Sequence, residues 1–144
     1  MKKILLVCLL LAARLAAAAL AEQPYEASGP SVQKTEATTS SGVPYTDISR
    51  TVRGKTQVHE FVDATGTVFA VSWSGPFKPD LQQLLGRHFG AYQKGEGRRT
   101  GDRTHERVDA GDMVVVSAGH MGAFVGRAWL PARLPAGFDT EAMK

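Results

Sequence analysis

Two alternating runs joined by a short turn constrain the fold of this chain most strongly. Residues 56–62 and 67–73 are rich in β-branched and aromatic residues, and their side chains fall on two alternating faces with the period of a strand. Between them lies Asp63-Ala64-Thr65-Gly66, a typical turn sequence in which Gly accepts a positive φ. The two runs therefore predict an antiparallel hairpin.

The segment after this hairpin predicts one amphipathic helix. Its apolar stripe has the i, i+3, i+4 spacing of a helix face and consists of Leu81, Leu84, Leu85, His88, Phe89 and Tyr92. Pro79 and Asp80 suit the first turn of this helix, and Gly95 suits its end. A lone amphipathic helix must bury its stripe, and the preceding hairpin is the nearest surface.

A second hairpin is expected nearer the C-terminus. Residues 113–117 and 123–130 are the two strands, and the Gly-rich residues 118–122 are their turn. Residues 94–112 are rich in charge and Gly and predict a solvated excursion, with room for one strand around 104–108. The expected fold class is α+β: a small antiparallel sheet built from two hairpins, with one amphipathic helix packed across it.

The N-terminal residues 1–21 have the pattern of a cleavable signal peptide. A positively charged start precedes the apolar run 4–13, and Ala19 and Ala21 stand at the −3 and −1 positions of a cleavage site before Glu22. This pattern predicts export, cleavage between Ala21 and Glu22, and a periplasmic location.

A transmembrane anchor is the alternative interpretation of the same segment. A spanning helix needs about 20 apolar residues, and Arg14 lies near the centre of the stretch 4–21. A central Arg costs about 2.5–3.5 kcal/mol on insertion scales, which an Ala-rich segment does not easily offset. We therefore expect no integral membrane span after signal removal.

The net charge and the cysteine content argue against nucleic-acid binding and against chemistry that depends on cysteine. Three of the 17 Lys and Arg residues lie within residues 1–21, which leaves 14 against 14 Asp and Glu residues in the remainder. A neutral remainder gives no electrostatic reason to expect nucleic acid as a partner. The single cysteine, Cys8, lies in the same segment, so the processed chain has no thiol chemistry or Cys-based metal site. We expect no cofactor.

Residues 22–44 are expected to form a flexible arm rich in Ser, Thr and Pro, and residues 45–144 a single α+β domain. Within the arm, residues 31–39 offer an alternative as an edge strand. The 100 residues from 45 to 144 are enough for one domain, because a chain of about this length can bury a modest core.

Chemistry-bearing residues are few. The four histidines lack metal-ligand spacing. Ser117 and His120, with Asp112 to orient the imidazole, suggest a small hydrolase. The competing interpretation is a tight turn with His120 at its tip, because turn geometry explains the neighbouring glycines and no strand-to-helix elbow follows.

Two long stretches of sequence resemble a known family. The residues GTVFAVSWSGPFKPDLQQLLGRHFGAY and GHMGAFVGRAWLPARLPAG are similar to the exported proteobacterial family called domain of unknown function 2844, over about Tyr45 to Gly137. The resemblance implies a small periplasmic protein of Gram-negative bacteria. It implies no activity and no site residues.

Three functions remain open at this point. The first is a non-enzymatic binding or accessory module of the cell envelope, with His120 and Arg127 as candidate binding residues toward an unknown envelope protein or component. The second is a structural subunit whose edge strands complete a partner's sheet. The third is the small hydrolase that uses Ser117 and His120.

Overall fold

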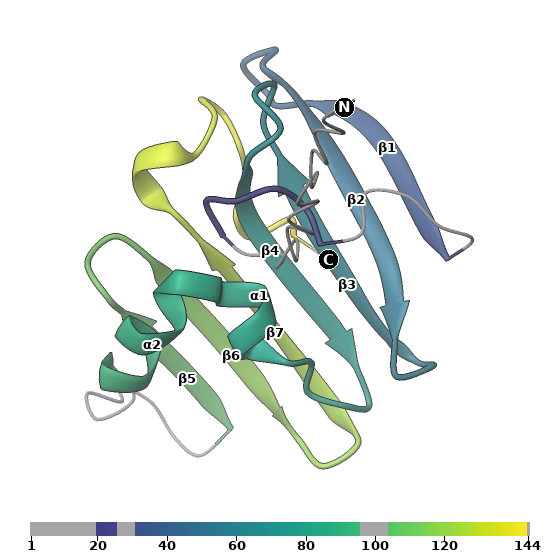
Figure 1. The fold of residues 1–144 in the computed structure, drawn as a ribbon, viewed down its shortest axis with the longest axis vertical. Coiled ribbons are helices and arrows are strands. Elements are labelled where there is room, and N and C mark those ends of the chain that lie inside the picture. Colours follow the sequence, from purple (N-terminus) through teal and green to yellow (C-terminus); the bar gives the residue numbers. More distant parts are fainter. Residues whose placement is uncertain (1–19, 26–30, 96–103, 144) are drawn as a thin grey trace, which may run out of the picture.

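A seven-stranded antiparallel sheet forms the body of the protein (Figure 1). The structure is a computed structural model that describes residues 20–25, 31–95 and 104–143. The strands are β1 (Val32–Thr38), β2 (Pro44–Val52), β3 (Thr56–Val62), β4 (Val68–Gly75), β5 (His105–Asp109), β6 (Val114–His120) and β7 (Ala123–Trp129). Their order across the sheet is β1-β2-β3-β4-β7-β6-β5, so β4 is the central strand.

The first predicted hairpin is confirmed as β3 and β4. Val58 lies opposite Trp73, and Glu60 lies opposite Val71. The turn between them has Gly66 at φ 83°, and the Asp63 carboxylate accepts hydrogen bonds from the backbone N–H groups of Thr65 (2.9 Å) and Thr67 (3.1 Å). This Asx-type turn fixes the start of β4.

The sheet has more strands than the two predicted hairpins supply. The structure is therefore mostly β with a helix, and the α+β expectation holds only in that coarser form. Within the residues expected to form an arm, β1 pairs with β2 along its whole length, from Val32 opposite Arg50 to Thr38 opposite Pro44. The edge strand considered for residues 31–39 is thus present. The strand anticipated around residues 104–108 is β5.

The second hairpin is confirmed, but its turn is shorter than predicted. β6 continues to His120, and only Met121 and Gly122 separate it from β7. Gly122 has φ 88° and makes the turn. Gly119 is instead a ladder residue, where a Cβ would overlap the backbone of Ala123. Close approach of two backbones, and not the turn, explains that glycine.

The predicted helix is present, but it is broken in two. α1 (Leu81–Leu85) and α2 (Phe89–Gly95) are separated by a 3₁₀ turn, Gly86–His88, and Gly86 has φ 50°. Asp80 is the N-cap and not a first-turn residue, because its side chain accepts a hydrogen bond from Gln83 N at 3.1 Å. The buried members of the predicted stripe are Leu81, Leu84, Leu85, His88 and Tyr92.

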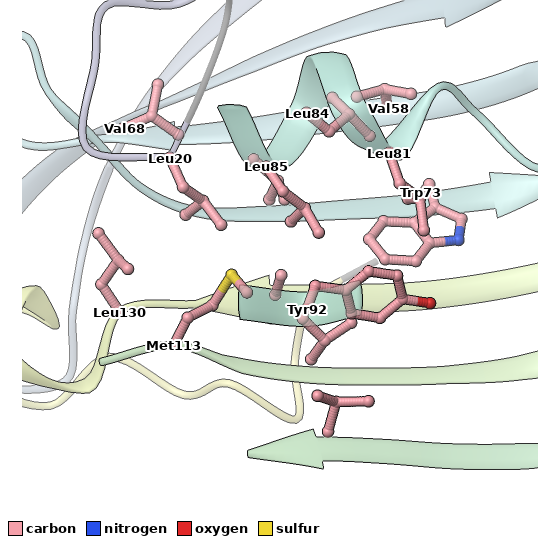
Figure 2. Packing of buried hydrophobic residues seen from close by; sticks show 14 of the residues in the cluster. Leu20, Val58, Val68, Trp73, Leu81, Leu84, Leu85, Tyr92, Met113 and Leu130 are labelled. Atoms are coloured by element: carbon pink, nitrogen blue, oxygen red, sulfur yellow. The ribbon is translucent and has the colours of Figure 1, made fainter. Parts of the chain in front are cut away.

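Both faces of the sheet are covered near its centre. The inner face packs against α1, α2 and the N-terminal segment 20–25 (Figures 1 and 2). The outer face packs against C-terminal residues. These residues come after β7 and after the 3₁₀ turn Pro131–Arg133 that follows it. The cluster on the outer face contains Phe61, Phe69, Ala70, Val114 and Trp129, with Leu134, Phe138 and Met143 against it.

Trp73 organises the inner core. It is 1 % exposed and shares a cluster with Leu81 and Tyr92 of the helical layer (Figure 2). Its indole lies over β7 at Gly126, where a Cβ would overlap the ring. The absence of a side chain at Gly126 therefore creates the space that the indole fills.

A buried ion pair lies on the same inner face. Arg50 and Glu60, on neighbouring strands, are 4 % and 1 % exposed and are hydrogen-bonded to each other. The Tyr25 ring lies 5.3 Å from the Arg50 guanidinium carbon, and Tyr25 N donates to Glu60 Oε1 at 3.4 Å. The N-terminal segment thus shields two charges from water.

Within the described part of the chain, neither helix has the length and apolar character required to cross a bilayer.

Replacing Gly126 by Ala should lower the free energy of unfolding by about 1–3 kcal/mol, because the new methyl group overpacks the core against Trp73. The matched control is Gly90→Ala in α2, where nothing lies within 4 Å of the added Cβ. That change should raise the free energy by about 0.5–1 kcal/mol through helix propensity. Urea unfolding measures both, and a Gly126→Ala protein as stable as wild type contradicts the assigned indole packing.

Acid sensitivity is expected at the β3–β4 turn. Partial burial raises the pKa of Asp63. Hydrogen bonds from Thr65 and Thr67 and the charge of Arg133 lower it by a larger amount, so the net pKa is below its usual value of 3.8. The stabilisation is present above the unfolded-state pKa and disappears as the pH falls through the lowered folded-state pKa.

Asp63→Asn should therefore cost about 1 kcal/mol at neutral pH and flatten the decline of stability at acidic pH. Asp109→Asn removes the same charge from a turn where the carboxylate has one weak 3.4 Å contact with Gly111 N, and serves as the control. Unfolding free energies between neutral and acidic pH provide the measurement. Parallel curves for Asp63→Asn and wild type would rule out this role.

Candidate functional site

The predicted nucleophile and base point to opposite faces of the sheet. Ser117 and His120 both belong to β6 and are three residues apart, and side chains at odd spacing alternate across a strand. Ser117 shares the inner face with Val115, whereas His120 projects from the outer face at the end of the strand. The two side chains cannot form a nucleophile–base pair in this fold.

The proposed third member is also elsewhere. Asp112 lies before β6, eight residues from His120, which corresponds to about 25 Å along a strand. Its carboxylate lies 3.3 Å from Nδ1 of His88, a residue that is only 7 % exposed. Asp112 therefore tethers the helical layer to the start of β6 and does not orient His120.

The two candidate binding residues share the outer face but do not touch. His120 is exposed at the end of β6, and its Nδ1 lies 3.0 Å from the carbonyl of Met121. Arg127 on β7 pairs with Val116, four residues from His120, which places it about 13 Å along the strand. Its guanidinium forms an ion pair with the exposed Glu141.

A shallow hollow lies on the outer face beside Arg127. Its volume is ≈ 220 Å³, and its lining includes His105, Val116, Ala118, Val125, Arg127 and Met143. The floor is apolar, and the Arg127 guanidinium on one wall is already paired with Glu141. Such a surface can accept an apolar side chain.

The exposed large hydrophobic residues within the described ranges gather at one end of the sheet. Met121 is 92 % exposed in the β6–β7 turn, and Val125 is 50 % exposed on the outer face. Phe77 is 46 % exposed and follows the end of β4, whose last residue, Gly75, lies opposite Phe124. We call the outer-face residues His120, Val125 and Arg127, together with Met121 of the adjoining turn, the tip surface.

One polar constellation was not predicted from the sequence. Nδ1 of His59 lies 2.9 Å from Oδ1 of Asp47 on the neighbouring strand, and its ring stacks on Phe61 with centroids 6.2 Å apart. A neutral His59 then donates from Nδ1 and keeps Nε2 as an acceptor. Ser72 lies opposite His59 on β4.

Carboxylate, imidazole and hydroxyl are the residue types of a hydrolase triad. Ser72 is only 1 % exposed, however, so its hydroxyl is not presented to a substrate. We assign the Asp47–His59 pair to cross-strand stabilisation of β2 and β3. Asp47 was out of reach of the sequence analysis because no strand was predicted over residues 44–52. The pairing of His59 with Ser72 depends on a β-bulge at Phe61 and Val62.

Within the described ranges, no three His, Cys, Asp or Glu side chains come together in a way that could hold a metal ion.

Comparison with protein families covers nearly the whole chain. Residues 16–143 match the model of a family described as a protein of unknown function, DUF2844. The chain belongs to the DUF2844 family. The match begins well before Tyr45 and so includes the N-terminal segment 20–25 and β1, which the sequence resemblance had left out. Searches of curated proteins and of solved structures found no match.

A serine-directed phosphonate probe should leave Ser117 unlabelled, because the base proposed for it projects from the other face. Intact-mass measurement after incubation of the folded protein checks this, with an active serine hydrolase in the same tube as positive control. A phosphonyl adduct mapped to Ser117 would restore the hydrolase hypothesis.

Proposed function

We propose that this DUF2844 protein is an exported, non-enzymatic binding or accessory module of the cell envelope that captures a protein partner through the tip surface. Export is supported by the sequence of residues 1–21, with a positive start, an apolar run and small residues beyond it. The binding role is supported by the exposed tip surface. It is also supported by the placement of Ser117 and His120 on opposite faces of β6, where they cannot act together as a hydrolase pair.

The observation that carries the proposal is the exposure of Met121 and Val125 at one end of the sheet. A single exposed apolar residue is ordinary, whereas a group of them beside polar residues is typical of a protein-interaction surface. His120 and Arg127 supply polar groups beside these residues, and the outer hollow next to Arg127 supplies a recess. Arg is also one of the residue types that often dominate binding energy.

A structural subunit is the second candidate, and the sheet edges favour it. β1 and β5 are the two edge strands, and β1 is seven residues long. An edge strand can accept a strand from another protein. Lys34 and Glu36 are exposed on β1, and charges on an edge oppose such pairing. We therefore rank this candidate below the tip surface.

Site-specific photo-crosslinking in the cells that produce the protein separates the two candidates. A crosslinker at Met121 should give one discrete adduct, whereas a crosslinker at Gln33 on β1 should give none. The double variant His120→Ala/Arg127→Ala should weaken the Met121 adduct roughly tenfold, as a loss of about 1.4 kcal/mol predicts.

The matched control for the double variant is Lys34→Ala/Glu36→Ala, which changes exposed charges on β1 and should leave the Met121 adduct unchanged. An adduct at Gln33 but not at Met121 supports the structural subunit instead. An adduct with the mass of a second copy of this chain would replace the partner with self-association.

A further inference from the structure

Leu20 is a core residue of the folded domain. It is 0 % exposed and belongs to the inner cluster. Figure 2 shows its side chain directed into the space between Leu85, Met113 and Leu130. Truncation of a leucine in such a position to alanine removes apolar contacts and leaves a cavity.

The backbone around Leu20 is fastened to two elements. Leu20 N donates to the Leu84 carbonyl of α1 at 3.2 Å, and Ala21 N donates to the Val68 carbonyl of β4 at 2.8 Å. Val68 N returns a bond to the Glu22 carbonyl at 2.9 Å. Residues 20–22 thus bridge the helical layer to the central strand.

Ala21 shows how firmly this bridge is held. Its φ is 70°, a left-handed conformation that costs a non-Gly residue free energy. The conformation persists because the residues on both sides of Ala21 are anchored by hydrogen bonds. These contacts also position Tyr25 over the buried Arg50–Glu60 pair.

Cleavage after Ala21 would remove these contacts. The hydrogen bonds from Leu20 N and Ala21 N would be lost, and the space filled by Leu20 would become a cavity in the inner core. The family match begins at residue 16, so the family's shared sequence also extends upstream of Leu20.

Resting on the proposed export, we propose that the signal peptide is cleaved after Ala18 or Ala19, so that the mature chain keeps Leu20. Residues 16–19 are all alanine, so both bonds have small residues at −3 and −1. A signal peptidase hydrolyses one peptide bond with one water, which leaves a carboxylate on the departing peptide and an amino group on the mature chain.

The first test is the intact mass and N-terminal sequence of the protein recovered from the periplasm after expression of the full chain. We expect a chain that begins at Ala19 or Leu20. A chain that begins at Glu22 overturns this inference and leaves export intact. A chain that is absent from the periplasm and keeps Met1 in the cytoplasm overturns the proposed export.

The second test uses Leu20→Ala in the full chain. If Leu20 is retained, the mature variant is lighter than wild type by three methylene groups, and its Tm falls by about 10 °C or more. If cleavage follows Ala21, the variant and wild-type mature proteins are identical in mass and Tm. The matched control is Gln23→Ala, an exposed residue of the same segment, which should change the mass and leave the Tm within a few degrees.

Discussion

The fold depends on one strand that is buried on both faces. β4 is the fourth of seven strands, and its first six residues are all buried, including Val71 on one face and Ala70 on the other. A strand of this kind needs a packing layer on each side of the sheet. The helices and residues 20–25 cover the inner face, and the residues after β7 cover the outer face. Both ends of the described chain are therefore part of the core.

The Arg50–Glu60 pair explains why the N-terminal segment reaches so far across the sheet. α1 and α2 cover the β4–β7–β6–β5 half of the inner face, whereas the ion pair lies on β2 and β3 (Figure 1). A buried ion pair is costly unless the surrounding groups satisfy its hydrogen-bonding capacity. Tyr25 supplies both a backbone donor to Glu60 and a ring face to Arg50. The N-terminal segment that begins at Leu20 therefore also covers this ion pair.

The sequence predicted those parts of the fold in which local pattern and tertiary environment agree. The β3–β4 hairpin and the buried stripe from Leu81 to Tyr92 have strong periodicity and were correctly placed. The break at Gly86 was missed because the stripe continues across a single glycine. β1 was given only as an alternative because edge strands bury little and show weak alternation. Its pairing comes from β2, far outside any local window.

The candidate site was less predictable because it depends on where strands end. Ending β6 at Ser117 makes His120 a turn residue free to approach the serine, whereas continuing it to His120 sends the two side chains to opposite faces. The deciding residue is Gly119, whose role becomes evident only from the neighbouring backbone of Ala123. Exposed residues such as Met121 are not selected by core packing, so no hydrophobic pattern reveals them. Register brings them to one end of the sheet, and register is a property of the assembled strands.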